Sequence, residues 1–197
     1  MNNEQAWIFQ AQNDDEEAFS KLVERYQTPV YNLCHRMLGE PEAAEDAAQE
    51  TFLRAYQNIW RYNRERPFAT WLLSIAAHYC IDRLRRRKFV FVSTDDEEGV
   101  LELPDAKAPN PEAEAMRGEE REHLQRLLQS LDGTDRAAIV LRYWYDFSEI
   151  EIAQALSLTV SAVKSRLHRA RRELARRWLE ASPQTSVERM PYESPAF

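Results

Sequence analysis

The segment of residues 148–177 constrains the fold of this chain more than any other. It reads SEIEIAQALSLTVSAVKSRLHRARRELARR. Ser148 followed three residues later by Glu151 is a capping box, which predicts that a helix begins there. This helix is expected to end at Ser157-Leu158, and a second, basic helix follows. Two short helices joined by a tight turn predict a helix-turn-helix unit with a basic recognition helix.

The turn of this unit has one unusual residue. Ser157 occupies the position that usually holds glycine, and a left-handed conformation there costs a residue with a side chain about 1 kcal/mol. Such a cost is tolerable in this motif. The first helix is expected to direct four apolar residues toward a core, namely Ile150, Ile152, Ala153 and Leu156.

The second helix has a buried face and a basic face. Val163, Leu167, Ala170 and Leu174 recur at helical spacing and predict the buried stripe. Short polar residues on the other face can reach base edges, and long cations can reach guanine or phosphate. An alternative is a solvated basic helix, although Glu173 is the one acid between Lys164 and Arg177. The predicted contacts to duplex DNA are Ser161, Lys164, Ser165, Arg166, His168, Arg169 and Arg172.

The average charge of the chain hides this basic face. The 197 residues include 26 Lys and Arg against 33 Asp and Glu, a net charge of −7. Acidic residues gather at 14–17, 40–50 and 95–122, whereas cations gather at 83–88 and 164–177. Because the cations form two separate patches, we expect two DNA contacts.

The composition predicts an all-α protein. Glycines are few, and no sustained run alternates Val, Ile and Thr as a strand would. No apolar run approaches the ~18 residues of a membrane span. The N-terminus also lacks the blocks of a signal peptide, so we expect no membrane insertion and a cytoplasmic location.

Cys34 and Cys80 are too few for a disulfide scaffold. With His35 and His78 they could be drawn as a zinc site, but the spacing resembles no zinc finger or knuckle. Packing in the core is therefore the preferred interpretation, and we expect neither a metal nor another cofactor.

Changes in composition divide the chain into two small helical domains. Residues 93–118 are acidic, contain Pro104, Pro109 and Pro111, and lack helical periodicity, which predicts a flexible linker. The expected division is an N-terminal helical bundle at 1–92, the linker at 93–118, a helix-turn-helix domain at 119–180 and a disordered tail at 181–197.

Three helices are predicted in the first domain. The first extends from about Phe19 to Met37 and is bent or interrupted at Thr28-Pro29. The second, residues 42–60, shows an acidic face that also carries an exposed leucine; this face indicates either a partner surface or a solvated surface with one stray leucine. The third begins near Pro67 and changes from aromatic to strongly basic, so it is expected to pack at one end and meet phosphates at the other.

Three motifs in order resemble the extracytoplasmic function (ECF) sigma factors of bacterial RNA polymerase. They are DAAQETFLRAY at 46–56, PFATWLLSIAAHYCIDRLRRR at 67–87 and LRYWYDFSEIEIAQALSLTVSAVKSRLHRARREL at 141–174. The resemblance covers about residues 15–178. It departs from the family pattern at Leu131-Asp132-Gly133, where the family often has Leu-Pro-Pro, and at His78, where the family often has Asn.

The resemblance implies a role for each segment. The helix-turn-helix would read the promoter −35 element as duplex, and core RNA polymerase and an anti-sigma factor would be protein partners. The contacts to the polymerase would come from Asp46, Gln49, Glu50 and Leu53. The −10 element would be melted and read by Trp71, Ser74, His78, Tyr79, Arg83, Arg86 and Arg87. For His78 the alternative is a packed histidine that is satisfied by a neighbouring backbone carbonyl.

Two other functions are compatible with parts of the sequence. A stand-alone helix-turn-helix regulator would need a ligand pocket or a dimerising apolar seam in residues 1–90, where the pattern indicates a compact bundle. An enzyme would need a convergent polar site, yet the histidines are scattered along the chain and no nucleophile motif is present. We therefore expect a sigma factor that directs promoter-specific transcription initiation and is not an enzyme.

Overall fold

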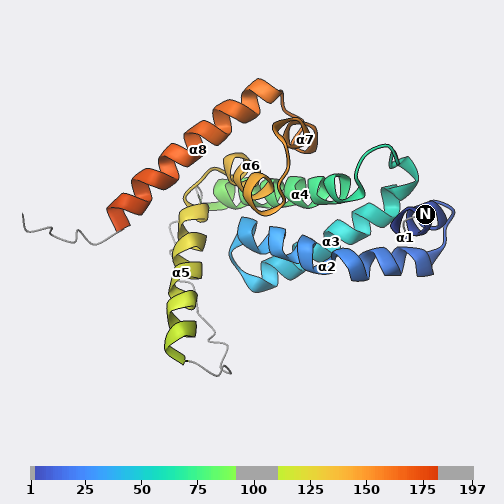
Figure 1. Ribbon diagram of the computed structural model, residues 1–197, viewed down its shortest axis with the longest axis horizontal. Helices are drawn as coiled ribbons and strands as arrows, with labels where there is room; N and C mark the ends of the chain where they lie inside the picture. The colour runs from blue at the N-terminus through green and yellow to red at the C-terminus, as the bar shows by residue number, and fades with distance from the viewer. Residues whose placement is uncertain (1–2, 92–110, 182–197) are drawn as a thin grey trace, which may run out of the picture.

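The computed structural model describes residues 3–91 and 111–181, and within these ranges every regular element is helical. This agrees with the predicted all-α fold of two helical domains (Figure 1). The N-terminal bundle comprises α1 (Asn3–Ala11), α2 (Glu16–Leu38), α3 (Pro41–Asn58), the 3-10 turn η1 (Ile59–Arg61) and α4 (Phe68–Phe91). The C-terminal helices are α5 (Pro111–Gln129), α6 (Gly133–Trp144), α7 (Glu149–Ala155) and α8 (Val160–Ala181).

The N-terminal bundle forms because α2, α3 and α4 each bury one apolar face against the others. The Asp15 side chain accepts a hydrogen bond from the Ala18 backbone N–H and begins α2. Gly39, with φ 88°, ends α2 in the left-handed conformation. Pro41 then stands at the start of α3, where its missing N–H costs nothing.

The predicted interruption at Thr28-Pro29 is absent. Helix α2 continues through Pro29, with Leu22 and Val30 buried on either side of it. A proline inside a helix costs about 3 kcal/mol. Packing of α2 against α1, α3 and α4 along its length offsets that cost and keeps the helix continuous.

Helix α5 begins earlier than the sequence indicated. Its first residue is Pro111, which the linker prediction of 93–118 had included. Proline suits the first helical turn, and the residues after it, EAEAM, are good helix formers, so the helix extends into the acidic segment. The rest of that linker, from 93 to 110, and the tail from 182 lie outside the described residues.

The predicted helix-turn-helix is present as α7 and α8. Ser148 and Glu151 form the complete capping box, with the Ser148 hydroxyl accepting from the Glu151 N–H at 3.2 Å. Ser157 has φ 55°, the left-handed conformation predicted for the turn. One prediction for α7 is wrong: Ile150 lies in its first turn and is 60% exposed, because at about 100° per residue it lies about 160° around the helix from the buried Ile152.

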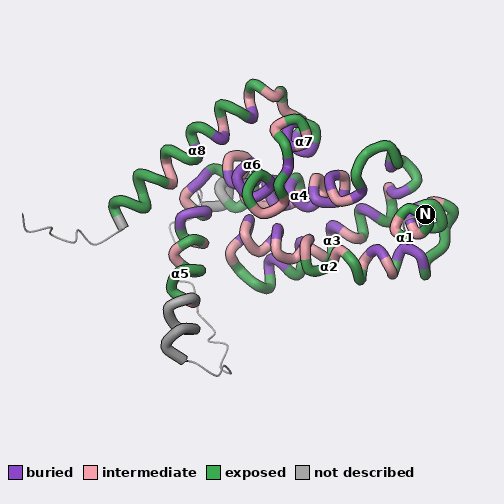
Figure 2. The backbone as a smooth tube through the Cα atoms, in the orientation of Figure 1, coloured by how far each residue is buried: buried purple, intermediate pink, exposed green. Residues whose placement is uncertain are grey.

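The two domains pack directly on each other, and we call this contact the domain seam. Helices α5 and α6 contact α2, while α6 and α7 contact α4. Buried residues therefore continue from the N-terminal bundle into α6 and α7 (Figure 2). Gly133 permits the close approach of α6 to α4, since a Cβ there would lie 3.3 Å from Leu84 Cδ1.

The seam is polar where α2 ends. The last carbonyls of a helix have no partner within the helix. Here side chains from the C-terminal helices supply the donors: Arg136 donates to Met37 O, and the Gln125 amide donates to His35 O at 3.1 Å. The Tyr145 hydroxyl donates to Pro29 O at 2.6 Å, one further tie between the domains.

Cys34 and Cys80 are both buried, as predicted for core residues. Within the described ranges, no group of three or more His, Cys, Asp or Glu side chains is arranged to hold a metal ion. No helix in these ranges is long and apolar enough to span a bilayer.

Candidate nucleic-acid interface

Helix α8 presents the predicted basic face to solvent. Val163, Leu167 and Ala170 are buried against α6 and α7, and Leu174 is half-buried. The residues on the opposite face are therefore accessible to a DNA duplex. The exposed members of the predicted set are Ser161, Lys164, Ser165, His168, Arg169 and Arg172.

Arg166 is the exception in that set. Its guanidinium donates to Asp135 Oδ1 of α6 at 2.6 Å, and its side chain is only 28% exposed. The same carboxylate oxygen lies 3.9 Å from Arg169. Arg166 is therefore directed back toward α6, whereas Lys164 stays 63% exposed with a looser contact to Glu149 at 3.6 Å.

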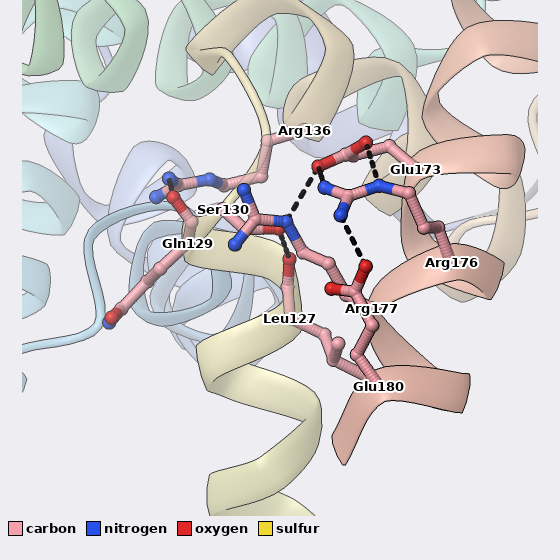
Figure 3. A network of polar contacts seen from close by, with 8 residues as sticks. All are labelled: Leu127, Gln129, Ser130, Arg136, Glu173, Arg176, Arg177 and Glu180. Atoms are coloured by element: carbon pink, nitrogen blue, oxygen red, sulfur yellow. Dashed lines mark hydrogen bonds and ion pairs between the residues drawn. The ribbon is translucent and has the colours of Figure 1, made fainter. Parts of the chain in front are cut away.

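Near the C-terminal end of α8, acidic residues form ion pairs with its arginines. Glu173 contacts both Arg176 and Arg177 at 2.6 Å, and Glu180 contacts Arg176 at 2.6 Å (Figure 3). These two hydrogen-bonded arginines hold the pKa of Glu173 at about 2, below its usual 4.5. Because its carboxylate stays charged, the two arginines are partly neutralised, and the most strongly cationic part of the face lies N-terminal to Glu173.

Helix α4 carries the second predicted nucleic-acid face. At about 100° per residue, Ser74, Trp71 and His78 share its outer side. His78 is exposed, and its ring Nδ1 lies 2.9 Å from Ser74 O, so its other ring nitrogen faces outward. Trp71 is half-buried among Tyr62 and Phe68, with ring centroids 5.1 and 5.5 Å away. Tyr79 is half-buried, also on α4.

The basic end of α4 folds partly onto α3. The Arg87 guanidinium forms a bidentate ion pair with the Glu40 carboxylate, with both distances 3.0 Å, and Arg83 lies 3.5 Å from the Asp46 carboxylate. Arg86 is exposed and has no ion pair among the described residues. Arg86 is therefore available to bind a phosphate group, whereas Arg83 and Arg87 are already in contact with carboxylates.

The acidic face of α3 is exposed as predicted. Leu53 is 52% exposed, and Asp46 and Gln49 are also exposed. Glu50 is half-buried and contacts Arg54 at 2.6 Å. Leu53 therefore lies outside the bundle core and is accessible to a partner.

Sequence reasoning missed a group of two exposed aromatic–cation pairs, which lie in η1 and between α1 and the segment that follows η1. Trp60 of η1 is 63% exposed, with the Arg61 guanidinium 4.4 Å from its ring centroid. Phe9 of α1 is 52% exposed, with Arg64 at 5.1 Å. Exposed rings beside cations are platforms for stacking unpaired bases. The adjacent pair Trp60-Arg61 was the signal that could have indicated this group.

Two parts of the sequence match known families. Residues 22–90 match Sigma-70 region 2, and residues 121–174 match Sigma-70, region 4. The first segment includes α4 and the acidic face of α3, and the second includes the helix-turn-helix.

Curated relatives match over most of their length. The chain is 37% identical over 172 residues to the ECF RNA polymerase sigma factor SigW of Bacillus subtilis, covering 85% of this chain and 92% of SigW. It is 30% identical over 178 residues to the RNA polymerase sigma-H factor of Pseudomonas aeruginosa, covering 87% and 91%.

Solved structures share the fold. CnrH in complex with the cytosolic domain of CnrY has a TM-score of 0.65 and 23% identity, covering 92% of this chain and 100% of CnrH. RpoE of Bartonella quintana, in complex with the anti-sigma factor NepR, has a TM-score of 0.62 and 20% identity, covering 84% and 98%. With both sigma-70 regions in order and SigW matched over nearly its full length, this chain belongs to the ECF family of RNA polymerase sigma factors.

Proposed function

We propose that this sigma factor docks on core RNA polymerase through the acidic face of α3, contacts the −10 element with α4 and contacts the −35 element with α8. The observation that carries the proposal is that all three surfaces are exposed at once on a single packed scaffold. The inner sides of the three helices pack within the molecule, α3 against α2 and α4, α4 also against α6 and α7, and α8 against α5, α6 and α7, so their outer sides are available for partners.

On α8, short and long side chains contact different parts of the DNA. Ser165 and His168 reach base edges in the major groove, while the exposed Lys164, Arg169 and Arg172 supply contacts to guanine or phosphate. Ser161 stands at the first turn of the helix, beside the duplex backbone. Arg166 is left out of this set, because its side chain is engaged by Asp135.

On α4, His78 is the proposed base-reading residue of the −10 element. Opening a duplex costs a few kcal/mol of lost stacking, which a protein offsets by stacking an extruded base and bonding its edge. Imidazole does both, and His78 stands exposed beside Ser74, Trp71 and Tyr79. Arg83, Arg86 and Arg87 would bind the phosphates of the same region, and the Trp60 group extends the stacking surface.

Other parts of the proposal follow from the family. RpoE of Bartonella quintana binds the anti-sigma factor NepR in its solved structure, which supports an anti-sigma partner for this chain as well. We propose that the chain acts in the cytoplasm, where core polymerase and promoters meet, and has no enzymatic activity of its own. For domain boundaries we propose 1–92 for the first domain; the second, expected at 119–180, begins at Pro111 because α5 starts there.

The polymerase contact can be tested with Leu53→Ala combined with Gln49→Ala. Both side chains are exposed, so we expect weaker assembly with core polymerase and an unchanged melting temperature. Asp46 is left intact because it also contacts Arg83. Glu24→Ala, an exposed acid on α2, is the matched control. Normal assembly by the double variant would contradict the proposed surface.

A second measurement separates a sigma factor from a stand-alone regulator. Promoter duplex is mixed with the full-length chain, with or without core polymerase, at physiological salt. A sigma factor forms a specific complex that depends on polymerase. Tight and sequence-specific binding by the chain alone would favour the regulator instead.

A further inference from the structure

Asp135 occupies a position that no DNA contact explains. It lies in the first turn of α6, outside the helix-turn-helix, and its side chain is only 15% exposed. Its Oδ1 atom accepts from Arg166 at 2.6 Å and lies 3.9 Å from Arg169. The carboxylate therefore stands between two arginines of the helix that is proposed to read DNA.

The two arginines differ in how strongly Asp135 holds them. Arg166 is 28% exposed and forms a short, charge-assisted hydrogen bond, so it is fixed against α6. Arg169 is 63% exposed and remains able to swing toward a duplex. The backbone N–H groups at the start of α6 favour a carboxylate at this place and disfavour a bare guanidinium. Without the Asp135 charge, the attraction that holds Arg166 against the α6 surface would be lost.

We propose that Asp135 is a positioning residue for −35 recognition, which keeps Arg166 off the DNA backbone and restrains Arg169. Cations that meet phosphate raise affinity for every sequence equally, whereas base-edge contacts distinguish sequences. By holding one cation and restraining another, Asp135 lowers the sequence-independent part of binding and leaves the contribution of Ser165 and His168 intact. The inference rests on the proposed role of α8 at the −35 element.

The test measures binding of holoenzyme, assembled from the full chain and core polymerase, as a function of salt concentration. Promoters with the intact and a scrambled −35 element are compared. Each phosphate contact contributes about 0.9 to the slope of log affinity against log salt. Asp135→Asn frees Arg166 to reach phosphate, so we expect the slope to steepen by about 0.9. Discrimination between the two promoters should fall.

Two arginine variants make the test specific. Arg166→Ala should leave the slope unchanged, because Arg166 does not contact phosphate. Arg172→Ala removes an exposed cation and should lower the slope by about 0.9 on both promoters. Asp135→Glu keeps the carboxylate charge, so this variant should again discriminate between the two promoters. If Asp135 only stabilised α6, discrimination would not require the charge.

Several outcomes would overturn the inference. One is that Arg166→Ala lowers the slope of log affinity against log salt as much as Arg172→Ala does, which would make Arg166 a phosphate contact. Another is an Asp135→Asn slope equal to that of wild type. If Asp135→Asn fails to fold, the Arg166→Ala comparison alone still decides. A wild-type holoenzyme that ignores scrambling of the −35 element would refute the proposed role of α8 itself, a result distinct from these.

Discussion

Arg136 is the side chain whose removal should most weaken the domain seam. It is 5% exposed, and its guanidinium donates to Met37 O of α2, to Gln129 O at 2.7 Å and to Leu131 O at 3.2 Å. Figure 3 shows the bond to Gln129. One side chain thus joins the end of α2 to the connection between α5 and α6. Truncation in Arg136→Ala deletes all three bonds together.

The magnitude follows from two opposing effects. Hydrogen bonds from a charged donor contribute about 2 kcal/mol each, net of desolvation, so the three bonds stabilise the fold by about 6 kcal/mol. Burial lowers the pKa of Arg136 to about 10, and its buried Nε–H has no hydrogen-bond partner among the described residues, which costs about 3 kcal/mol. The difference predicts that Arg136→Ala lowers the free energy of unfolding by about 3 kcal/mol.

Urea denaturation followed by circular dichroism measures this change. Arg136→Met keeps most of the aliphatic packing while losing the same bonds, and Arg121→Ala removes an exposed arginine of α5 as a control. We expect a similar loss for Met, a change below about 0.5 kcal/mol for the control, and faster hydrogen exchange at the seam. An Arg136→Met protein as stable as wild type would refute the reasoning, because desolvation would then cancel the bonds.

Three other changes have defined outcomes. Burial, and to a lesser degree the nearby Arg36 charge, lowers the pKa of His35 below 6.5. The stability that His35 contributes is therefore present above pH 6.5 and is lost as the pH falls through its lower, folded-state pKa. His35→Gln should flatten the pH dependence of the urea midpoint in this range. Ser157→Gly should raise the free energy of unfolding by about 0.5 kcal/mol, because relief of left-handed strain exceeds the added chain entropy; an equal or lower midpoint would contradict that. His78→Ala should change base preference at one −10 position in transcription from a promoter library and keep the melting temperature; unchanged preference would rule out base reading by His78.

Local sequence signals predicted the local structure well. The capping box at Ser148, the left-handed turn at Ser157 and the buried stripe through Val163 depend on residues within a few positions of each other. Spacing alone therefore suffices to infer them. The exposed face of α8 follows from the same periodicity, and this made most of its site predictable.

Contacts between distant residues could not be predicted in this way. Arg136 bonds to Met37, 99 positions away, and Arg166 bonds to Asp135, 31 positions away. Helical spacing indicates which side of a helix is polar but not which carboxylate will meet a given arginine. The sequence therefore predicts Arg166 among the DNA contacts with no sign of its bond to Asp135, and it does not predict the domain seam. Pro29 was overestimated as a break for the same reason, since packing from three other helices keeps α2 continuous.

The domain seam limits how freely the halves of such proteins can be recombined. Hybrid sigma factors that join one member's region 2 to another's region 4 treat the halves as interchangeable modules. Here Gly39 and Gly133 stand where a Cβ would meet Gln129 or Leu84 of the opposite half, at 1.9 and 3.3 Å. A larger residue at Gly133 would press on Leu84, and one at Gly39 would be strained by the φ of 88° and would displace the Gln129 side chain. A donor half without a guanidinium at position 136 would lose the bond to Met37 O. Functional hybrids of this chain should therefore inherit α2 and α4 together with α5 and α6 from the same parent.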